Sequence, residues 1–99
     1  MSWTIFRVPS ARKGDMDAAL ADDLVSRQSR KIRDAATLGG PAGELYVLIE
    51  GSPEGVGRAD AVLGPMGTRL TGDEAQKLFD RLAEEDQSSA AGMGLLFSD

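Results

Sequence analysis

The residue types of the chain limit the chemistry that it could perform. It contains no cysteine and no histidine, which removes thiolate nucleophiles, disulfides, most zinc sites and the commonest general base. Glu50 follows the most apolar stretch and is the acid expected to be partly buried, where its pKa could be raised. Tyr46 and Ser52 could assist it, but nothing in the sequence brings them together. We expect no catalytic residue, metal or cofactor, and a carboxylate enzyme stays an alternative.

A second candidate is the turn Gly51-Ser52-Pro53-Glu54-Gly55. It is placed where a strand feeds a helix, whose free N–H groups could hold an anion. Gly51, Ser52 and Gly55 are therefore candidate ligand-binding residues. The turn does not match the phosphate loop or the dinucleotide fingerprint, and Glu54 would repel a phosphate. An ordinary capped helix start explains the same residues.

Two charged clusters are candidate partner-binding surfaces. The basic residues Arg27, Arg30 and Lys31 are three and four positions apart and would share one face of a helix. That face could contact RNA or an acidic protein surface, although no aromatic residue is interleaved to stack on bases. The acids Glu84, Glu85 and Asp86 stand near an expected helix C-terminus, where the helix dipole disfavours negative charge. Solvated helix faces explain both clusters equally well.

The charges of the chain are divided unevenly along its length. Residues 1–40 carry seven Lys/Arg against five Asp/Glu, a balance of +2, whereas residues 41–99 carry four against eleven, a balance of −7. This division suits self-association or a charged partner better than DNA, which would repel the acidic half. No apolar run approaches the roughly 20 residues that span a bilayer, and no leader-like start is present. We expect a cytoplasmic protein that does not contact membranes.

Hydrophobic patterns predict the elements that would carry these residues. The stretch Trp3–Val8 is typical of a strand that ends at Pro9. An apolar stripe that begins with Met16, Leu20 and Leu24 predicts a helix from Asp15, as its cap, to about Leu38. Gly39-Gly40-Pro41 would end that helix. The continuous apolar run Leu45–Ile49 predicts a strand at the centre of the sheet.

The second half of the chain gives four further expectations. Ser52 and Pro53 are typical of a helix start, with Val56, Ala59, Val62 and Leu63 on its buried side. Residues 66–70 are a candidate strand. Thr71 and Glu74 form a capping box before a helix that buries Ala75, Leu78, Phe79, Leu82 and Ala83. Residues 93–97 form a last candidate strand.

These elements predict one α/β (α+β) domain over residues 1–99, since the chain is too short for two cores. We expect a two-layer sandwich with a sheet of about four strands and two or three helices, and the element order is analogous to the ferredoxin-like plait. The leading hypothesis for function is a non-catalytic interaction or regulatory module that self-associates as a homodimer through a sheet edge or a helix face. A ligand site at the Gly51–Gly55 turn, RNA binding and a carboxylate enzyme are the alternatives.

Overall fold

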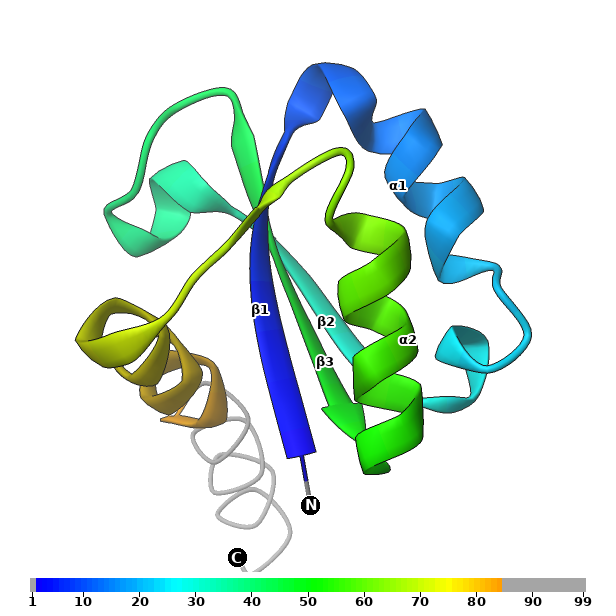
Figure 1. The fold of residues 1–99 in the computed structure, drawn as a ribbon. Helices are drawn as coiled ribbons and strands as arrows, with labels where there is room; N and C mark the ends of the chain where they lie inside the picture. The colour runs from blue at the N-terminus through cyan, green and yellow to red at the C-terminus, as the bar shows by residue number, and fades with distance from the viewer. Residues whose placement is uncertain (1, 85–99) are drawn as a thin grey trace, which may run out of the picture.

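The computed structural model describes residues 2–84, which contain a four-stranded sheet with helices on both of its faces (Figure 1). The strands are β1 (Ser2–Pro9), β2 (Ser29–Asp34), β3 (Glu44–Gly51) and β4 (Thr68–Arg69). Their order in the sheet is β2-β3-β1-β4, and every neighbouring pair is antiparallel. The expected α+β class with a four-stranded sheet is confirmed.

Three helical segments cover the sheet. Helices α1 (Lys13–Leu20) and α2 (Pro53–Leu63) lie together on one face, and this arrangement is consistent with the expected two-layer sandwich (Figure 1). A helical segment over residues 72–84 lies on the opposite face. Three short 3-10 helices join the elements: η1 (Ser10–Arg12), η2 (Val25–Arg27) and η3 (Ala35–Leu38). Among residues 2–84, no helix has the length and apolar character needed to cross a bilayer.

The two central strands carry the core because both of their faces are covered. Every residue from Leu45 to Ile49 is buried, as the apolar run predicts. Side chains alternate between the faces of a strand. Phe6, Val8, Val47 and Ile49 therefore join one cluster with side chains of α1 and α2. Ile5, Tyr46 and Leu48 join a second cluster on the other face.

The second cluster is completed by η3 and by the segment 72–84. That segment buries Ala75, Leu78 and Leu82, which confirms the predicted apolar face of this helix. The Trp3 ring stacks on Phe79 with a centroid distance of 4.5 Å. Segment 72–84 therefore packs over the start of β1.

The predicted helix from Asp15 to Leu38 is wrong over most of its length. The observed α1 begins at Lys13, with Asp15 inside its first turn, and it ends at Leu20. The Asp22 carboxylate then accepts hydrogen bonds from the N–H groups of Leu24 and Val25, which offers the backbone an alternative to a further helical turn. Residues 29–34 form the edge strand β2, in which Ile32 pairs with Val47 of β3.

The remaining predictions agree with the structure to different extents. Residues 66–70 include the two-residue strand β4, and the Leu70 N–H extends its pairing by donating to the Ile5 carbonyl at 2.9 Å. Helix α2 begins as predicted, with Ser52 as its N-cap and Pro53 in its first turn. The candidate strand 93–97 and the acids Glu85 and Asp86 lie outside the described residues.

Candidate functional site

The predicted anion-binding turn is occupied by a side chain of the protein itself. The Ser52 Oγ accepts a hydrogen bond from the Gly55 N–H at 3.1 Å, as expected of an N-cap. The Gln28 Oε1 accepts from the Ser52 N–H at 3.0 Å, while the Gln28 Nε2 donates to the Leu24 carbonyl. A Cβ added to Gly51 or Gly55 would overlap the Gln28 amide. The two glycines therefore make room for Gln28.

This arrangement changes what ligand binding at the turn would require. The N–H groups of Ser52 and Gly55, which the sequence predicted to bind an anion, already donate to acceptors within the protein. The next N–H group, that of Val56, donates to the Ser52 carbonyl. A ligand would have to displace Gln28 first. Binding at Gly51, Ser52 and Gly55 stays a prediction.

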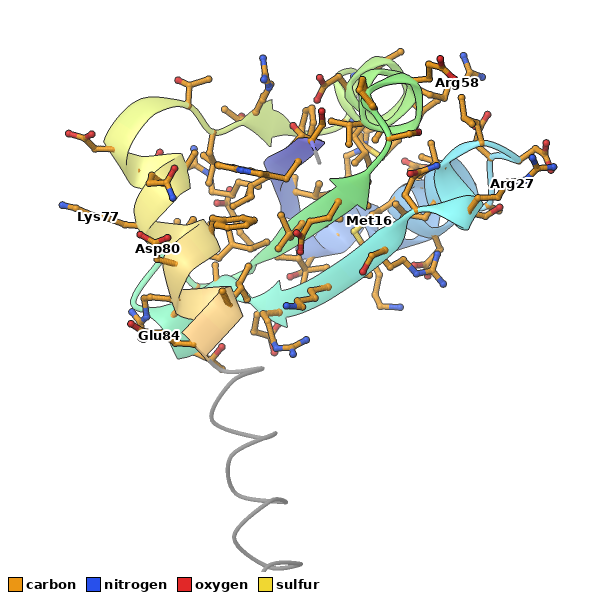
Figure 2. The ribbon with its side chains drawn as sticks, turned by 90° about the horizontal axis from the view of Figure 1, so that it is seen from below. Met16, Arg27, Arg58, Lys77, Asp80 and Glu84 are labelled. Atoms are coloured by element: carbon orange, nitrogen blue, oxygen red, sulfur yellow. The ribbon has the colours of Figure 1, made fainter. Side chains whose placement is uncertain are left out.

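The basic cluster lies on two different elements, so the predicted shared helix face is wrong. Arg27 ends η2 and forms an exposed ion pair with Asp23 at 3.2 Å. Arg30 and Lys31 are neighbours on β2. Since successive strand residues point to opposite faces, these two side chains diverge. Figure 2 shows Arg27 before the start of β2, beside the turn that leads into this strand.

The backbone of β2 presents an open edge. Backbone polar groups alternate in direction along an antiparallel strand. The Ile5 carbonyl is directed toward β4, since it accepts from Leu70. The Thr4 backbone, one residue earlier, is directed toward β3, where Thr4 pairs with Ile49. Leu48, the neighbour of Ile49, is directed toward β2, where it pairs with Lys31. The Lys31 backbone is accordingly directed toward β3. The backbone groups of Arg30, Ile32 and Asp34 are therefore directed away from β3, and no strand within residues 2–84 lies on that side.

Side chains of the protein already occupy part of this edge. The Arg33 guanidinium donates to the Ile32 carbonyl at 2.9 Å, and the Thr37 hydroxyl donates to the Asp34 carbonyl at 2.7 Å. These bonds are made at two of the three outward carbonyls that the alternation predicts. Charged and capped edges hinder unplanned strand pairing. Within residues 2–84, the N–H and C=O of Arg30 and the N–H of Ile32 thus stay open to an additional strand.

The acidic candidates Glu50 and Glu84 lie on different elements of the structure. Glu84 is exposed at the end of the described helix. Glu50 is half-buried on β3, with Trp3 and Ser29 as its cross-strand neighbours. Tyr46 lies four residues earlier on that strand, about 13 Å away at the usual rise per residue, and the Ser52 hydroxyl caps α2. Residues 2–84 contain no group of three acids that could hold a metal ion.

A pocket that sequence reasoning missed lies between the start of β1, the end of β4 and the segment 72–84. Its volume is about 310 Å³, within the usual range for small-molecule sites. Its lining includes Trp3, Arg69, Leu70, Thr71 and Gln76. Among residues 2–84, Arg69 is the only charged residue in this lining.

A buried hydroxyl and an acid stand behind Arg69. Thr4 is 2% exposed and is the one polar residue in the core of residues 2–84. Its hydroxyl donates to Asp60 Oδ1 at 2.7 Å. The same carboxylate oxygen lies 3.7 Å from the Arg69 Nε. A threonine within a strand that is otherwise largely apolar was the only sequence signal for this arrangement.

A second ion pair links α2 to the connection after α1. The Nε and Nη2 atoms of Arg58 lie 3.0 and 2.9 Å from Asp22 Oδ1. The hydrogen bond from Arg58 lowers the pKa of Asp22 below its ordinary value, and the same bond raises the pKa of Arg58. Because Asp22 also accepts the N–H groups of Leu24 and Val25, this pair holds the chain that leads into β2.

Comparison with known proteins adds no relative. No family model matches the chain, and neither a curated protein nor a solved structure matches it. The proposals that follow rest on the sequence and the geometry alone.

Proposed function

We propose that this chain is a cytoplasmic, non-catalytic protein-interaction module that adds an extended, acidic segment of a partner protein to its sheet along β2. The outer edge of β2 carries this proposal. It extends over six residues, and no strand among residues 2–84 pairs with it. Strand addition to such an edge is a common mode of peptide recognition, in which backbone hydrogen bonds supply affinity.

The charge of β2 favours an acidic partner. Arg30, Lys31 and Arg33 are three of its six residues. Arg30 is exposed, and no ion pair of Arg30 is found among the described residues. Side chains on adjacent strands lie about 4.5–5.5 Å apart, and opposite charges there contribute roughly 0.2–1 kcal/mol per pair. A partner strand with acids on the face of Arg30 would place a carboxylate within reach of this arginine.

Self-association is the second candidate, and the same charges oppose it at this edge. Two-fold antiparallel pairing of β2 about Lys31 would place that residue opposite itself, and pairing about Ile32 would place Lys31 opposite Arg33 of the second copy. Like charges directly opposite one another are destabilising. A homodimer would instead have to bring β2 against exposed acids of the segment 72–84, such as Asp80 and Glu84. We regard an acidic partner strand as the better fit.

The element order supports a finer description of the fold. The chain runs β-α-β-β-α-β before the last helix, and β1 and β3 occupy the centre of the sheet. Two interleaved β-α-β units form the ferredoxin-like plait. We propose that the module is a ferredoxin-like plait with an added C-terminal helix.

Fluorescence anisotropy tests the proposed function with two labelled ten-residue peptides, one alternating Glu with Val and one alternating Gln with Val. The Glu peptide is expected to bind more tightly, and increasing salt is expected to weaken it. Arg30→Gln should reduce its affinity about 1.5- to 5-fold, according to the energy of one cross-strand charge pair. Arg27→Gln is the matched control, because it removes an exposed arginine outside the edge.

Three outcomes would contradict the proposal. The first is equal binding of the two peptides, and the second is an equal loss in Arg27→Gln and Arg30→Gln. The third is preferential binding of a single-stranded oligoribonucleotide in the same assay, which would indicate that the basic surface binds RNA. Elution as a salt-sensitive dimer, together with no binding of either peptide, would favour self-association instead.

A further inference from the structure

We propose that the pocket between Trp3 and Arg69 is a separate binding site for a small ligand that carries one carboxylate on a flat, apolar body. This inference does not depend on the proposed function, because the pocket lies at the β4 side of the sheet and the edge of β2 lies at the other side.

The charge in the pocket selects the carboxylate. Arg69 contributes the only charge that residues 2–84 bring to the lining. Asp60 approaches Arg69 at Nε, 3.7 Å away, so within residues 2–84 the two terminal nitrogens of the guanidinium are left for a ligand. Two parallel N–H donors match the two oxygens of a carboxylate. The Arg69 side chain is 55% exposed, which keeps the site open to a ligand from solution.

The acid that faces Arg69 is held from the core. The Thr4 hydroxyl fixes Asp60 Oδ1 at 2.7 Å, and this oxygen faces Arg69. Thr4 is buried within β1, and Asp60 lies on α2, so each has little freedom to move. Asp60 therefore presents a fixed negative charge beside the Arg69 guanidinium.

Aromatic and apolar groups select the body of the ligand. Trp3 lines the pocket, and its ring is held by stacking on Phe79. Leu70 and Ala75 provide further apolar surface. A flat ring can pack against an indole, and such pairs contribute beyond the area that they bury. A benzoate-like acid combines the two features that the lining offers.

The backbone of Trp3 provides a further contact. The Ile5 carbonyl is directed to the β4 side, so the N–H and C=O of Trp3, two residues earlier, are directed to the same side. Strand β4 pairs with Phe6 and Arg7, and the pairing does not extend to Trp3. The carboxylate could therefore belong to a free acid or to the C-terminus of a peptide, whose last amide would pair with Trp3.

Tryptophan fluorescence offers a direct test, since Trp3 is the only tryptophan of the chain. The wild-type protein is titrated with benzoate and with benzamide, its neutral counterpart of the same shape. Benzoate is expected to give a saturable change at millimolar concentration, and benzamide at least about tenfold weaker binding, the usual scale of a charge-assisted hydrogen bond. Arg69→Gln should remove this preference, whereas Arg27→Gln should keep it.

Two further arms complete the experiment. N-acetyl-Gly-Phe with a free carboxylate is compared with its C-terminal amide, because tighter binding of this acid than of benzoate would identify a peptide end as the source, and the reverse a free acid. Far-UV circular dichroism confirms that each variant is folded. The inference is overturned if benzoate gives no saturable change in fluorescence up to about 20 mM or if benzamide binds equally well. It is also overturned if the folded Arg69→Gln variant retains the preference for benzoate.

Discussion

At the scale of single residues, Gln28 shows how one side chain can replace an expected ligand. Its amide joins the Leu24 carbonyl to the Ser52 N–H, so it links the connection after α1 to the start of α2. The sequence motif around Ser52 predicted the helix cap correctly. It gave no indication of Gln28, because the two residues are 24 positions apart and only the fold brings them together.

Glycine substitutions in α2 test the role of Gln28. Gly57→Ala adds a methyl group into open space and should raise the free energy of unfolding by about 0.5–1 kcal/mol. Gly55→Ala would displace the Gln28 amide from its hydrogen bonds and should lower it by about 0.5–1.5 kcal/mol. Urea denaturation measures both.

A double variant provides the control for this comparison. Gln28→Ala removes the obstructing amide, so Gly55→Ala should cost less in the Gln28→Ala background than in the wild-type protein. An equal cost in both backgrounds would show that Gln28 does not determine the need for glycine at position 55.

The ion pair of Asp22 and Arg58 predicts a pH dependence of stability. The folded-state pKa of Asp22 lies below 3.8, chiefly because Arg58 donates to it. A carboxyl group with a lowered pKa stabilises the protein above its unfolded pKa, and this stabilisation is lost as the pH falls through the folded value. Asp22→Asn should therefore be less stable than wild type at pH 7, and the difference should shrink below about pH 4.

Thermal denaturation between pH 7 and pH 2.5 measures this dependence. Asp23→Asn is the matched control, because the neighbouring Asp23 side chain is 88% exposed and its ion pair with Arg27 lies at the surface. Exposed pairs contribute little to stability. If Asp22→Asn and Asp23→Asn give the same curve, the account of Asp22 is wrong.

At the scale of elements, the sequence predicted those parts whose signals are local. β1, β3, α2 and the segment 72–84 all follow from apolar patterns together with proline, serine or capping residues. β2 was predicted as helix because its only large apolar residue is Ile32. A charged edge strand is defined by its pairing with β3, and that pairing cannot be seen in a local window.

Proline substitutions distinguish strand from helix over residues 29–34. The Lys31 backbone is directed toward β3, whereas the Arg30 backbone is directed to the open edge. Lys31→Pro removes a ladder hydrogen bond and leaves its acceptor on β3 unpaired, which should cost about 1–3 kcal/mol. Arg30→Pro should cost clearly less, since proline is tolerated on an edge strand whose N–H faces solvent.

Chemical denaturation of the two proline variants decides between the structures. In a helix interior both substitutions would cost about 3 kcal/mol or more. Similar large losses in both would therefore contradict the strand β2 and the open edge that depends on it.

At the scale of the whole molecule, two surfaces at opposite sides of one sheet are proposed to bind different partners. β2 offers backbone groups and cations to an acidic strand, and the pocket beside Trp3 offers one guanidinium and an indole to a small acid. The uneven charge of the sequence indicated a charged partner. It could not locate the contact, because Arg27, Arg30 and Lys31 were assigned to a helix that does not form.

The assembly state follows from the charges of the edge. Because self-pairing of β2 brings like charges together, the protein should elute as a monomer at low and at high salt. Light scattering should then detect a one-to-one complex with the alternating Glu peptide at low salt. A stable dimer without peptide would contradict the preference for an acidic partner over a second copy.

Amide hydrogen exchange of β2 tests the central claim most directly. With saturating Glu peptide, the outward N–H groups of Arg30 and Ile32 should exchange more slowly, because the added strand supplies their acceptors. The Lys31 N–H, which is directed toward β3, is the internal control and should change much less. Unchanged exchange at Arg30 and Ile32 when the peptide is bound would contradict strand addition at this edge.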